Sequence, residues 1–289
     1  MWLDGELVPA DRATVSLVDP AIQSGVGAFE TLAVRDGQPL DWEAHLERLE
    51  QTAKHLGFAA PERGRLAEGA ALVAPSVAGG FGWIKVIALR GGPCAVFGAS
   101  IDPAEVGRCV SAVLLPWRRS PNDPLAHLKT LNYAAFTLGL EEARRRGADE
   151  GLWLNTRGHL AEGCSSSIFV VWRRKLFTPS VRDGILPGVT RSIVLDAARA
   201  TGMVIHEGKV RLKRLETAGE AFLSSSVRGI RPLVRFEGRA VGDGEPGPIT
   251  RALAEKVRGL RRVGFFAAQD EGNRASEAAA EAAVPARGE

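Results

Sequence analysis

Two residues in the middle of the chain have side chains suited to covalent and acid–base chemistry. Lys129 stands in the segment Leu128-Lys129-Thr130-Leu131-Asn132-Tyr133, and Glu162 precedes a glycine, a cysteine and three serines that lead into an apolar run. A lysine amine can form a Schiff base with a carbonyl carbon, and a carboxylate can hold a protonated ring nitrogen. The pair therefore predicts a site where an amine and an acid act on one bound group.

Apolar residues at helical spacing follow Lys129 and continue to Arg146, and Gly147 is placed to end that helix in a left-handed conformation. We therefore expect Lys129 at the N-terminal end of a helix. There the helix dipole and partial burial both favour the neutral, nucleophilic amine. The alternative is a solvated surface lysine, which is the commoner role of a lone lysine.

Glu162 follows a predicted strand, Glu150 to Asn155, and a hairpin turn at Thr156-Arg157-Gly158. The apolar run Ile168 to Trp172 comes next. A carboxylate in such surroundings is costly unless a cation meets it, and a protonated ring nitrogen would do so. The alternative is a helix cap or a solvated glutamate in a turn.

A third segment, Asp183 to Ser192, contains Pro187 and Gly188 directly before a predicted helix. The free backbone N–H groups of Val189 and Thr190 at that helix start, with the Thr190 hydroxyl, form a candidate anion site. A phosphate group fits there. The same pattern is also common at ordinary helix starts.

In order and spacing these segments resemble the fold-type IV pyridoxal phosphate (PLP) family, also called class IV aminotransferases. That family includes branched-chain and D-amino-acid aminotransferases and 4-amino-4-deoxychorismate lyase. The resemblance runs from about Trp2 to Leu260. Its other motifs are Gly27-Ala28-Phe29-Glu30-Thr31, His45-Leu46-Glu47-Arg48-Leu49 and Glu220 to Pro232.

The resemblance implies PLP as cofactor, with Lys129 as the Schiff-base lysine and proton shuttle and Glu162 as the partner of the ring nitrogen. It also implies phosphate contacts and a tyrosine that touches a cofactor oxygen. The phosphate contacts would be Arg48, Val189, Thr190 and Ser226, and the tyrosine would be Tyr133, one residue nearer the lysine than in branched-chain enzymes. From the sequence alone, Arg48 lies on a predicted helix and could give a bidentate phosphate contact or be solvated.

The segment after Ser226 bears on the reaction. Ser226-Val227-Arg228-Gly229-Ile230-Arg231-Pro232 resembles the lyase more than the branched-chain enzymes, so Val227, Arg228 and Arg231 are candidate substrate contacts. Two arginines could meet the two carboxylates of aminodeoxychorismate, unless both point outward. The prediction is a lyase that releases pyruvate and 4-aminobenzoate.

Two other functions stay open. Gln23-Ser24-Gly25-Val26-Gly27 departs from the family pattern in a segment that tends to line the pocket, which could indicate an aminotransferase acting on D-amino or branched-chain amino acids. A PLP carrier or regulator without catalysis is the remaining alternative, and the presence of Lys129, Glu162 and Arg48 together argues against it.

The predicted fold is α+β or α/β, with the two domains of fold-type IV enzymes. Residues 1–115 form a smaller α+β domain, 116–124 a breaker-rich linker, 125–266 a larger PLP-binding domain, and 267–289 a disordered tail. In the first domain we expect a hairpin at Trp2 to Val8, and helices at Trp42 to Gly57 and within Glu62 to Val73. The expected strands are Gly27 to Val34, Gln38 to Leu40, Gly82 to Leu89, Val96 to Ile101 and Cys109 to Leu115.

Bulk composition is that of an ordinary soluble globular protein. The 289 residues are 45% hydrophobic and 25% charged, and the net charge of +3 is too small to suggest a nucleic-acid partner. Cys94, Cys109 and Cys164 lack metal-ligand spacing, so we expect reduced thiols in a cytoplasmic protein. No signal peptide or membrane-spanning run is visible. Family resemblance implies a homodimer.

Overall fold

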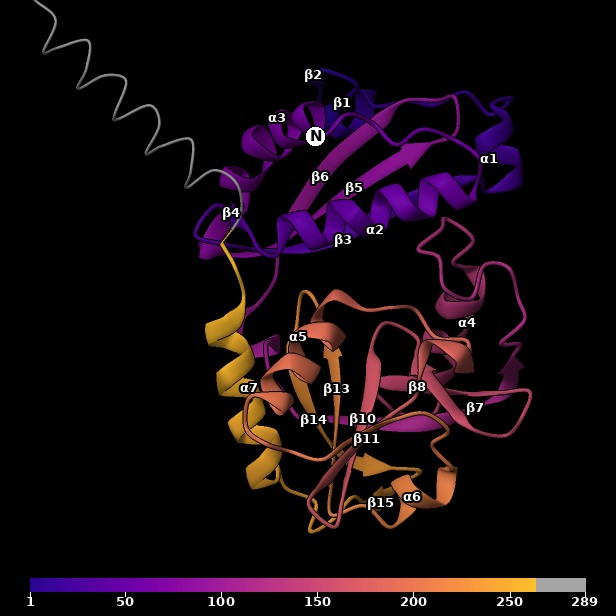
Figure 1. Ribbon diagram of the computed structural model, residues 1–289. Coiled ribbons are helices and arrows are strands. Elements are labelled where there is room, and N and C mark those ends of the chain that lie inside the picture. Colours follow the sequence, from indigo (N-terminus) through magenta and orange to yellow (C-terminus); the bar gives the residue numbers. More distant parts are fainter. Residues whose placement is uncertain (264–289) are drawn as a thin grey trace, which may run out of the picture.

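The computed structural model describes residues 1–263, which form two lobes, each built on a sheet (Figure 1). Residues 264–289 lie outside the described part of the chain, and the predicted tail lies among them. Within residues 1–263 no helix has the length and apolar run that crossing a bilayer requires. The mixed α/β fold confirms the predicted class.

The first lobe is a six-stranded antiparallel sheet with the strand order β2-β1-β6-β5-β3-β4. Its strands are β1 (Trp2–Leu3), β2 (Glu6–Leu7), β3 (Gly27–Arg35), β4 (Gln38–Pro39), β5 (Phe81–Leu89) and β6 (Cys94–Ser100). Its helices are α1 (Pro20–Ser24), α2 (Trp42–His55) and α3 (Arg63–Val73). The first hairpin turns at Asp4 and Gly5, both with positive φ, as a tight hairpin turn requires.

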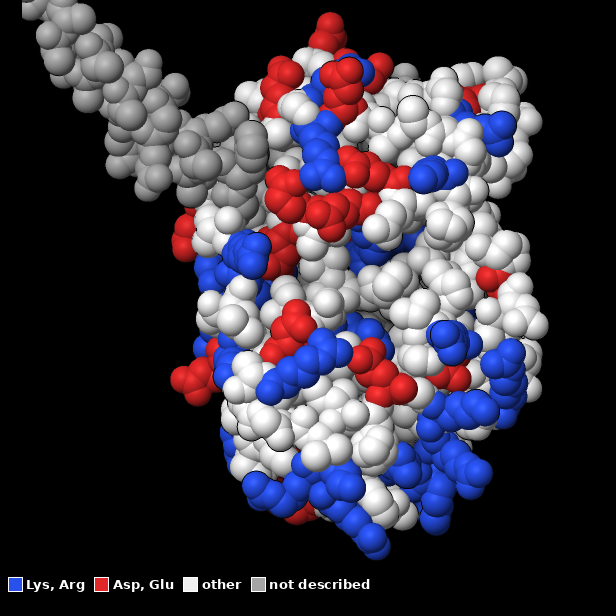
Figure 2. All heavy atoms as spheres, in the orientation of Figure 1, with Lys and Arg blue, Asp and Glu red and all other residues white. Residues whose placement is uncertain are grey.

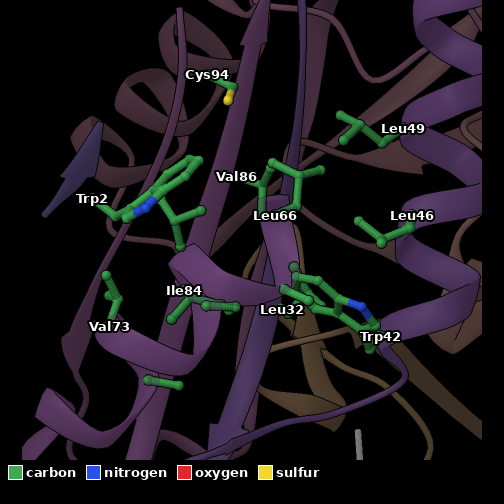
Figure 3. Close-up of a cluster of buried hydrophobic side chains, with 14 of the residues drawn as sticks. Trp2, Leu32, Trp42, Leu46, Leu49, Leu66, Val73, Ile84, Val86 and Cys94 are labelled. Carbon is green, nitrogen blue, oxygen red and sulfur yellow. The ribbon is translucent and has the colours of Figure 1, made fainter. Parts of the chain in front are cut away.

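The core of the first lobe lies between its sheet and its two longer helices. Along β5 the burial alternates, so that Ile84 and Val86 are fully buried while their neighbours are partly exposed. Leu46 and Leu49 reach from α2 toward these strands (Figure 3). Because both faces of this contact are apolar, α2 is held in one position against the sheet. Figure 1 shows α2 on the side of the first lobe next to the second.

The second lobe is a nine-stranded mixed sheet with the order β12-β11-β10-β13-β14-β7-β8-β9, and β15 pairs with β14. Its strands are β7 (Val110–Arg119), β8 (Glu150–Asn155), β9 (Leu160–Gly163), β10 (Ser167–Trp172), β11 (Lys175–Thr178), β12 (Ile205–Glu207), β13 (Glu220–Ser225), β14 (Gly229–Phe236) and β15 (Arg239–Ala240). Its helices are α4 (Ala134–Arg145), α5 (Val189–Arg199), α6 (Leu212–Glu216) and α7 (Pro248–Leu260). Basic side chains gather at the foot of this lobe, over α6 and β15 (Figure 2).

The strand expected at Cys109 to Leu115 does not complete the first lobe. It is β7, which lies in the second sheet, parallel to both β14 and β8. It continues to Arg119, through the first residues of the predicted linker, because its pairing with β8 shifts register between Leu114 and Arg118. That irregularity accommodates Pro116, which has no N–H to donate to a regular ladder. We therefore propose the domain boundary between β6 and β7 instead of at 116–124.

Hydrogen bonds at two places far apart in the sequence help to tie the lobes together. The backbone of Phe29 on β3 donates to the carbonyl of Lys129 at 3.0 Å. At the other end of the chain, Arg261 Nε lies 2.7 Å from Asp41 Oδ2, and the backbone of Arg262 donates to Asp41 Oδ1 at 3.0 Å. Both pairs join segments far apart in the sequence, so they fix the orientation of the lobes around the space between them.

Candidate active site

A cavity of about 460 Å³ lies where the two lobes meet. The first lobe contributes side chains from β3, α2 and β5, and the second lobe contributes the end of β7, the segment before α4, the turn after β9, the start of α5 and the loop after β13. Among the predicted site residues, the cavity is lined by Lys129, Glu162, Arg48, Val189, Thr190, Ser226, Tyr133, Val227 and Arg228. Nine residues chosen from separate motifs thus meet in one place.

Lys129 lies in the extended segment between β7 and α4. Its neighbour Thr130 forms an isolated antiparallel bridge with Ala28. The backbone N–H of Lys129 donates to Thr52 Oγ1 at 3.3 Å. The ammonium nitrogen is 4.4 Å from the centre of the Phe29 ring. Burial, and secondarily the charge of Arg48, lower the pKa of Lys129 to about 8.

The expectation that Lys129 begins a helix was wrong. Helix α4 begins at Ala134, so Lys129 lies too far upstream for the helix dipole to act strongly on its amine. The predicted end of this helix is confirmed, since Gly147 has φ 72°. The neutral amine is therefore favoured by burial and by a neighbouring cation, not by the helix.

Glu162 is nearly buried on β9, with 6% of its surface exposed. Its Oε2 accepts a hydrogen bond from the backbone of Leu186 at 3.0 Å, and its Oε1 lies 3.3 Å from Arg119 Nη1. Burial raises the pKa of Glu162 to about 7, although Arg119 opposes the rise. The carboxylate is thus held in place without being fully neutralised.

Glu162 Oε1 also tests whether PLP fits the site. Within the described residues this buried oxygen receives no hydrogen bond, and Glu162 lines the cavity together with Lys129. A buried acceptor without a donor is costly, and a protonated ring nitrogen would supply both the donor and the positive charge. The residues present therefore fit PLP.

The end of the cavity that is predicted to bind an anion is formed by the start of α5 and the loop after β13. Helix α5 begins at Val189 after Gly188, so the N–H groups of its first turn have no partner within the helix. Thr190 Oγ1 lies 3.4 Å from Ser226 Oγ, which brings the hydroxyl groups of the two predicted phosphate contacts together. Backbone donors and two hydroxyl groups on one wall suit a phosphate group.

Arg48 reaches this wall from α2, and most of its hydrogen-bonding capacity is already used. Its Nε and Nη2 lie 2.7 and 2.6 Å from Glu30 Oε1 and Oε2, and its Nη1 lies 3.1 Å from the carbonyl oxygen of Pro187. Glu30 is fully buried. The bidentate pair sets the guanidinium plane, so Arg48 offers a fixed positive charge to the cavity.

Tyr133 lines the cavity beside Lys129. Its ring stacks on Phe136, with 4.5 Å between ring centroids, and packs edge-on against Phe29. Its hydroxyl donates to the carbonyl of Cys164 at 3.1 Å. Contact with a cofactor oxygen stays a prediction, and it would have to use the lone pairs of this hydroxyl because its proton is engaged. Cys164 itself is buried, with 2% of its surface exposed.

The two arginines expected to bind substrate lie in different environments. Arg228 lines the cavity, half-buried, with its Nε 3.7 Å from Glu105 Oε2. Arg231 does not reach the cavity, because it is 5% exposed and its Nη2 lies 3.3 Å from Glu150 Oε2. The expected substrate contact of Arg231 is therefore withdrawn.

Four further residues complete the wall or its support. Lys85 and Arg119 line the cavity, while Glu30 and His45 form a buried hydrogen-bonded pair behind it, with 2.6 Å between His45 Nδ1 and Glu30 Oε2. Glu30 and His45 belong to motifs already recognised in the sequence, which identified the segments without assigning these roles. Alternation along β5 was the available signal for Lys85. Arg119 had none, because it stood in an apparent linker.

Comparison with known proteins agrees with this geometry. The family model for amino-transferase class IV matches residues 27–236. The branched-chain amino acid aminotransferase of Escherichia coli superposes with a TM-score of 0.82 at 26% identity, covering 90% of this chain and 93% of that one. A hypothetical aminotransferase from Mycobacterium tuberculosis in its PLP-bound form gives 0.79 at 29% identity, covering 88% and 95%.

A third similar structure is a Legionella pneumophila protein provisionally named 4-amino-4-deoxychorismate lyase. Its TM-score is 0.76 at 28% identity, and the match covers 86% of this chain and 96% of that one. The family match spans both lobes and every cavity-lining motif. The chain therefore belongs to the class IV aminotransferase family and is a PLP-dependent enzyme of fold type IV.

Proposed function

We propose that this enzyme is a 4-amino-4-deoxychorismate lyase, which releases pyruvate and 4-aminobenzoate. The observation that carries the proposal is a pair of cations, Lys85 and Arg228, on the cavity wall, which Lys129, Arg48, Arg119 and Arg191 also line. Aminodeoxychorismate has two carboxylates, and two separate cations suit them. The stretch Ser226 to Pro232, with its resemblance to the lyase, supports the same choice.

Lys85 is the stronger of the two candidates for binding a substrate carboxylate. It extends from β5 with its nitrogen 5.1 Å from the centre of the Phe29 ring, and burial lowers its pKa. Among residues 1–263 no carboxylate lies within ion-pair distance of it. A partly buried cation without an anion favours binding of an anionic ligand.

The roles of the cofactor-binding residues belong to the same proposal. Arg48, Thr190 and Ser226, with the N–H groups at Val189, would hold the phosphate, and Glu162 would hold the ring nitrogen. Bound PLP would supply an aldehyde that condenses with amines and a ring that withdraws electrons. Lys129 would bind that aldehyde and, once displaced by the substrate amine, remove the proton from the substrate carbon that carries nitrogen.

In the lyase reaction, enolpyruvate leaves from the carbon next to the one that carries nitrogen. After Lys129 takes the proton, the carbon–oxygen bond on that neighbouring carbon breaks, and enolpyruvate takes up a proton to become pyruvate. The ring of the other product becomes aromatic as 4-aminobenzoate. Glu162 would hold the protonated ring nitrogen of bound PLP, a role that its otherwise unpaired oxygen suits.

The second candidate is an aminotransferase for D-amino or branched-chain amino acids with a 2-oxo acid acceptor. Its support is the likeness to the E. coli branched-chain enzyme over 90% of the chain. Lys85 and Arg228 could also hold the two carboxylates of 2-oxoglutarate. In that reaction Lys129 would remove the same proton from the substrate carbon that carries nitrogen, and no carbon–oxygen bond of the substrate would break.

Product analysis distinguishes the lyase from the aminotransferase. Purified enzyme loaded with PLP is given aminodeoxychorismate, and separately D-alanine or L-leucine with 2-oxoglutarate. We expect 4-aminobenzoate and pyruvate in equal amounts from the first mixture, and much slower formation of glutamate in the second. Rapid glutamate formation without any 4-aminobenzoate would refute the lyase proposal and support the aminotransferase.

We also propose that the enzyme is a homodimer. The support lies in the segment before α1, where Leu17 and Val18 are 82% and 78% exposed. Two adjacent exposed apolar side chains favour a protein partner. Light scattering after size exclusion should give twice the mass of one chain, and Leu17→Lys with Val18→Lys should shift the protein toward monomer. A wild-type protein that is monomeric at all concentrations would refute the proposal.

A further inference from the structure

A chain of hydrogen bonds, fully buried at its Glu30 end, runs from the first lobe to the cavity wall formed by Ser226 and Thr190. Glu30 Oε2 lies 2.6 Å from His45 Nδ1, His45 Nε2 lies 3.1 Å from Ser226 Oγ, and Ser226 Oγ lies 3.4 Å from Thr190 Oγ1. Glu30 and His45 are both fully buried. Because each group along the chain has a limited number of protons, the state of one end sets the direction of the bonds at the other.

The Glu30 end of the chain is an acceptor. Burial raises the pKa of Glu30, but the charge and hydrogen bonds of Arg48, with those of His45, outweigh it and lower the pKa to about 2. Glu30 is therefore a carboxylate at neutral pH. The nitrogen next to it, His45 Nδ1, must then carry a proton, whatever the state of the other ring nitrogen.

Ser226 is affected by that other nitrogen, His45 Nε2. In a neutral ring with its proton on Nδ1, Nε2 is a bare acceptor, so Ser226 must direct its only hydroxyl proton at His45. That leaves the Ser226 oxygen with lone pairs toward the cavity. A phosphate dianion requires donors, and lone pairs facing it are unfavourable.

Proton uptake at Nε2 reverses the bond. A doubly protonated His45 donates to Ser226 Oγ, and the hydroxyl proton of Ser226 is free to point at the phosphate. The charged groups facing the ring are Glu30, which favours the second proton, and Arg48 and Arg261, which oppose it; burial opposes it most. In the absence of an anion these effects together lower the pKa of His45. A phosphate beside Ser226 adds the negative charge that reverses this balance.

We propose that His45 is a positioning residue that takes up a proton from solvent when a phosphate group binds beside Ser226, and that this proton turns the Ser226 hydroxyl toward the phosphate. The inference rests on the proposed position of the phosphate. It concerns how this chain adapts its own hydrogen bonds to an anion, and it is independent of whether the enzyme is a lyase or an aminotransferase.

Histidine nitrogen NMR tests it directly on the wild-type protein. The ¹⁵N shifts of the His45 ring are recorded at about pH 7.5, where an unperturbed histidine is neutral, without ligand, with PLP, and with pyridoxal, which has the aldehyde but no phosphate. We expect a neutral ring protonated on Nδ1 without ligand and with pyridoxal, and a doubly protonated ring with PLP. His55, exposed on the same helix, is the internal control and should not change.

Calorimetry in buffers of different ionisation enthalpy measures how many protons the protein takes up when a ligand binds. PLP and pyridoxal react with the same lysine, so the difference between them removes the contributions of Lys129 and Glu162. We expect PLP binding to take up about one proton more than pyridoxal binding in the wild type, and this difference to vanish in His45→Gln and in Ser226→Ala.

The outcomes separate this inference from the function on which it rests. A PLP absorbance band that depends on Lys129, with a His45 ring that stays neutral, would overturn the inference alone. A His45 ring that is doubly protonated before any ligand is added would also overturn it. Failure of PLP to give any band that depends on Lys129 would overturn the proposed function and the inference together.

Discussion

Glu162 Oε1 lies 3.3 Å from Arg119 Nη1 and still receives no hydrogen bond from it among the described residues. The guanidinium of Arg119 instead lies 4.3 Å above the Phe136 ring, which holds it at that angle. Arg119 thus gives Glu162 partial charge compensation and leaves one oxygen free. This arrangement makes Glu162 costly in the protein alone and useful once a protonated nitrogen is bound.

The first prediction is that Glu162→Gln stabilises the cofactor-free protein above pH 7. The pKa of Glu162 is raised from 4.5 to about 7 in the fold, so the folded state binds more protons than the unfolded state between these values. Stability is therefore lost as pH rises through about 7, by roughly 3 kcal/mol for this group. The side-chain amide of Glu162→Gln does not titrate, so the variant does not lose this stability as pH rises.

Urea unfolding of both proteins without PLP, at a series of pH values, measures the difference. The stabilities should converge toward pH 4.5 and separate toward pH 8 in favour of Glu162→Gln. Glu141→Gln, at an exposed position on α4, is the control and should follow the wild type. A variant that is less stable than the wild type at pH 8 would contradict the prediction. With PLP bound, the wild type should be the better enzyme, and kcat of Glu162→Gln should fall by about 10²-fold.

The second prediction concerns the pH at which Lys129 reacts. Its pKa is lowered to about 8, so the neutral amine dominates above that pH, well below the range of an ordinary lysine. The rate of Schiff-base formation with pyridoxal, followed by absorbance, should rise with pH and level off above about 8. Lys129→Ala should form no band, and Lys85→Ala should retain it. A rate that still rises steeply at pH 10 would show that Lys129 is not buried as described.

Local structure and the main site residues could be predicted from the sequence because their signals are short. Glu150–Asn155 has the predicted bounds, and the helix Trp42–His55 begins at the predicted residue, since alternation, helical periodicity and flanking glycine or proline act within a few residues. Lys129 and Glu162 stand in recognisable motifs. Their common location in one cavity is then a consequence of the family fold.

Long-range pairing could not be predicted in the same way. Whether β7 joins the first or the second sheet depends on parallel partners some 40 and 120 residues away, Glu150 and Leu233 among them, and no local pattern specifies them. Arg119 was missed for that reason. The substrate contact predicted for Arg231 was wrong because two residues three apart near the start of a strand can lie in different environments. Arg231 pairs with the buried Glu150, which is distant in the sequence.

The third prediction separates Arg228 from Arg231. Arg228→Ala removes a half-exposed side chain and should change stability by less than about 0.5 kcal/mol, while it raises KM for a dicarboxylate substrate by about tenfold or more. Arg231→Ala leaves Glu150 buried without its cation and should destabilise the fold by about 3 to 5 kcal/mol. Urea unfolding and steady-state kinetics on both variants measure the contrast. An unaltered KM in Arg228→Ala would remove Arg228 from the substrate site.

The last prediction tests how tightly α4 packs behind the cavity. A Cβ at Gly139 would lie 2.7 Å from Cys164 Sγ and 2.9 Å from Leu115 Cδ1, whereas a Cβ at Gly259 near the end of α7 would meet nothing within 4 Å. Gly139→Ala should therefore destabilise the protein by about 1 to 3 kcal/mol through overpacking. Gly259→Ala should stabilise it by up to about 1 kcal/mol through helix propensity.

The same substitution in two helices thus has opposite expected signs, and the free energy of unfolding in urea measures both. Because Cys164 also accepts the Tyr133 hydroxyl at 3.1 Å, displacement of α4 should reach the cavity and weaken PLP binding in Gly139→Ala only. Equal gains in stability for the two variants would show that the contact between α4 and the turn after β9 is looser than these distances imply.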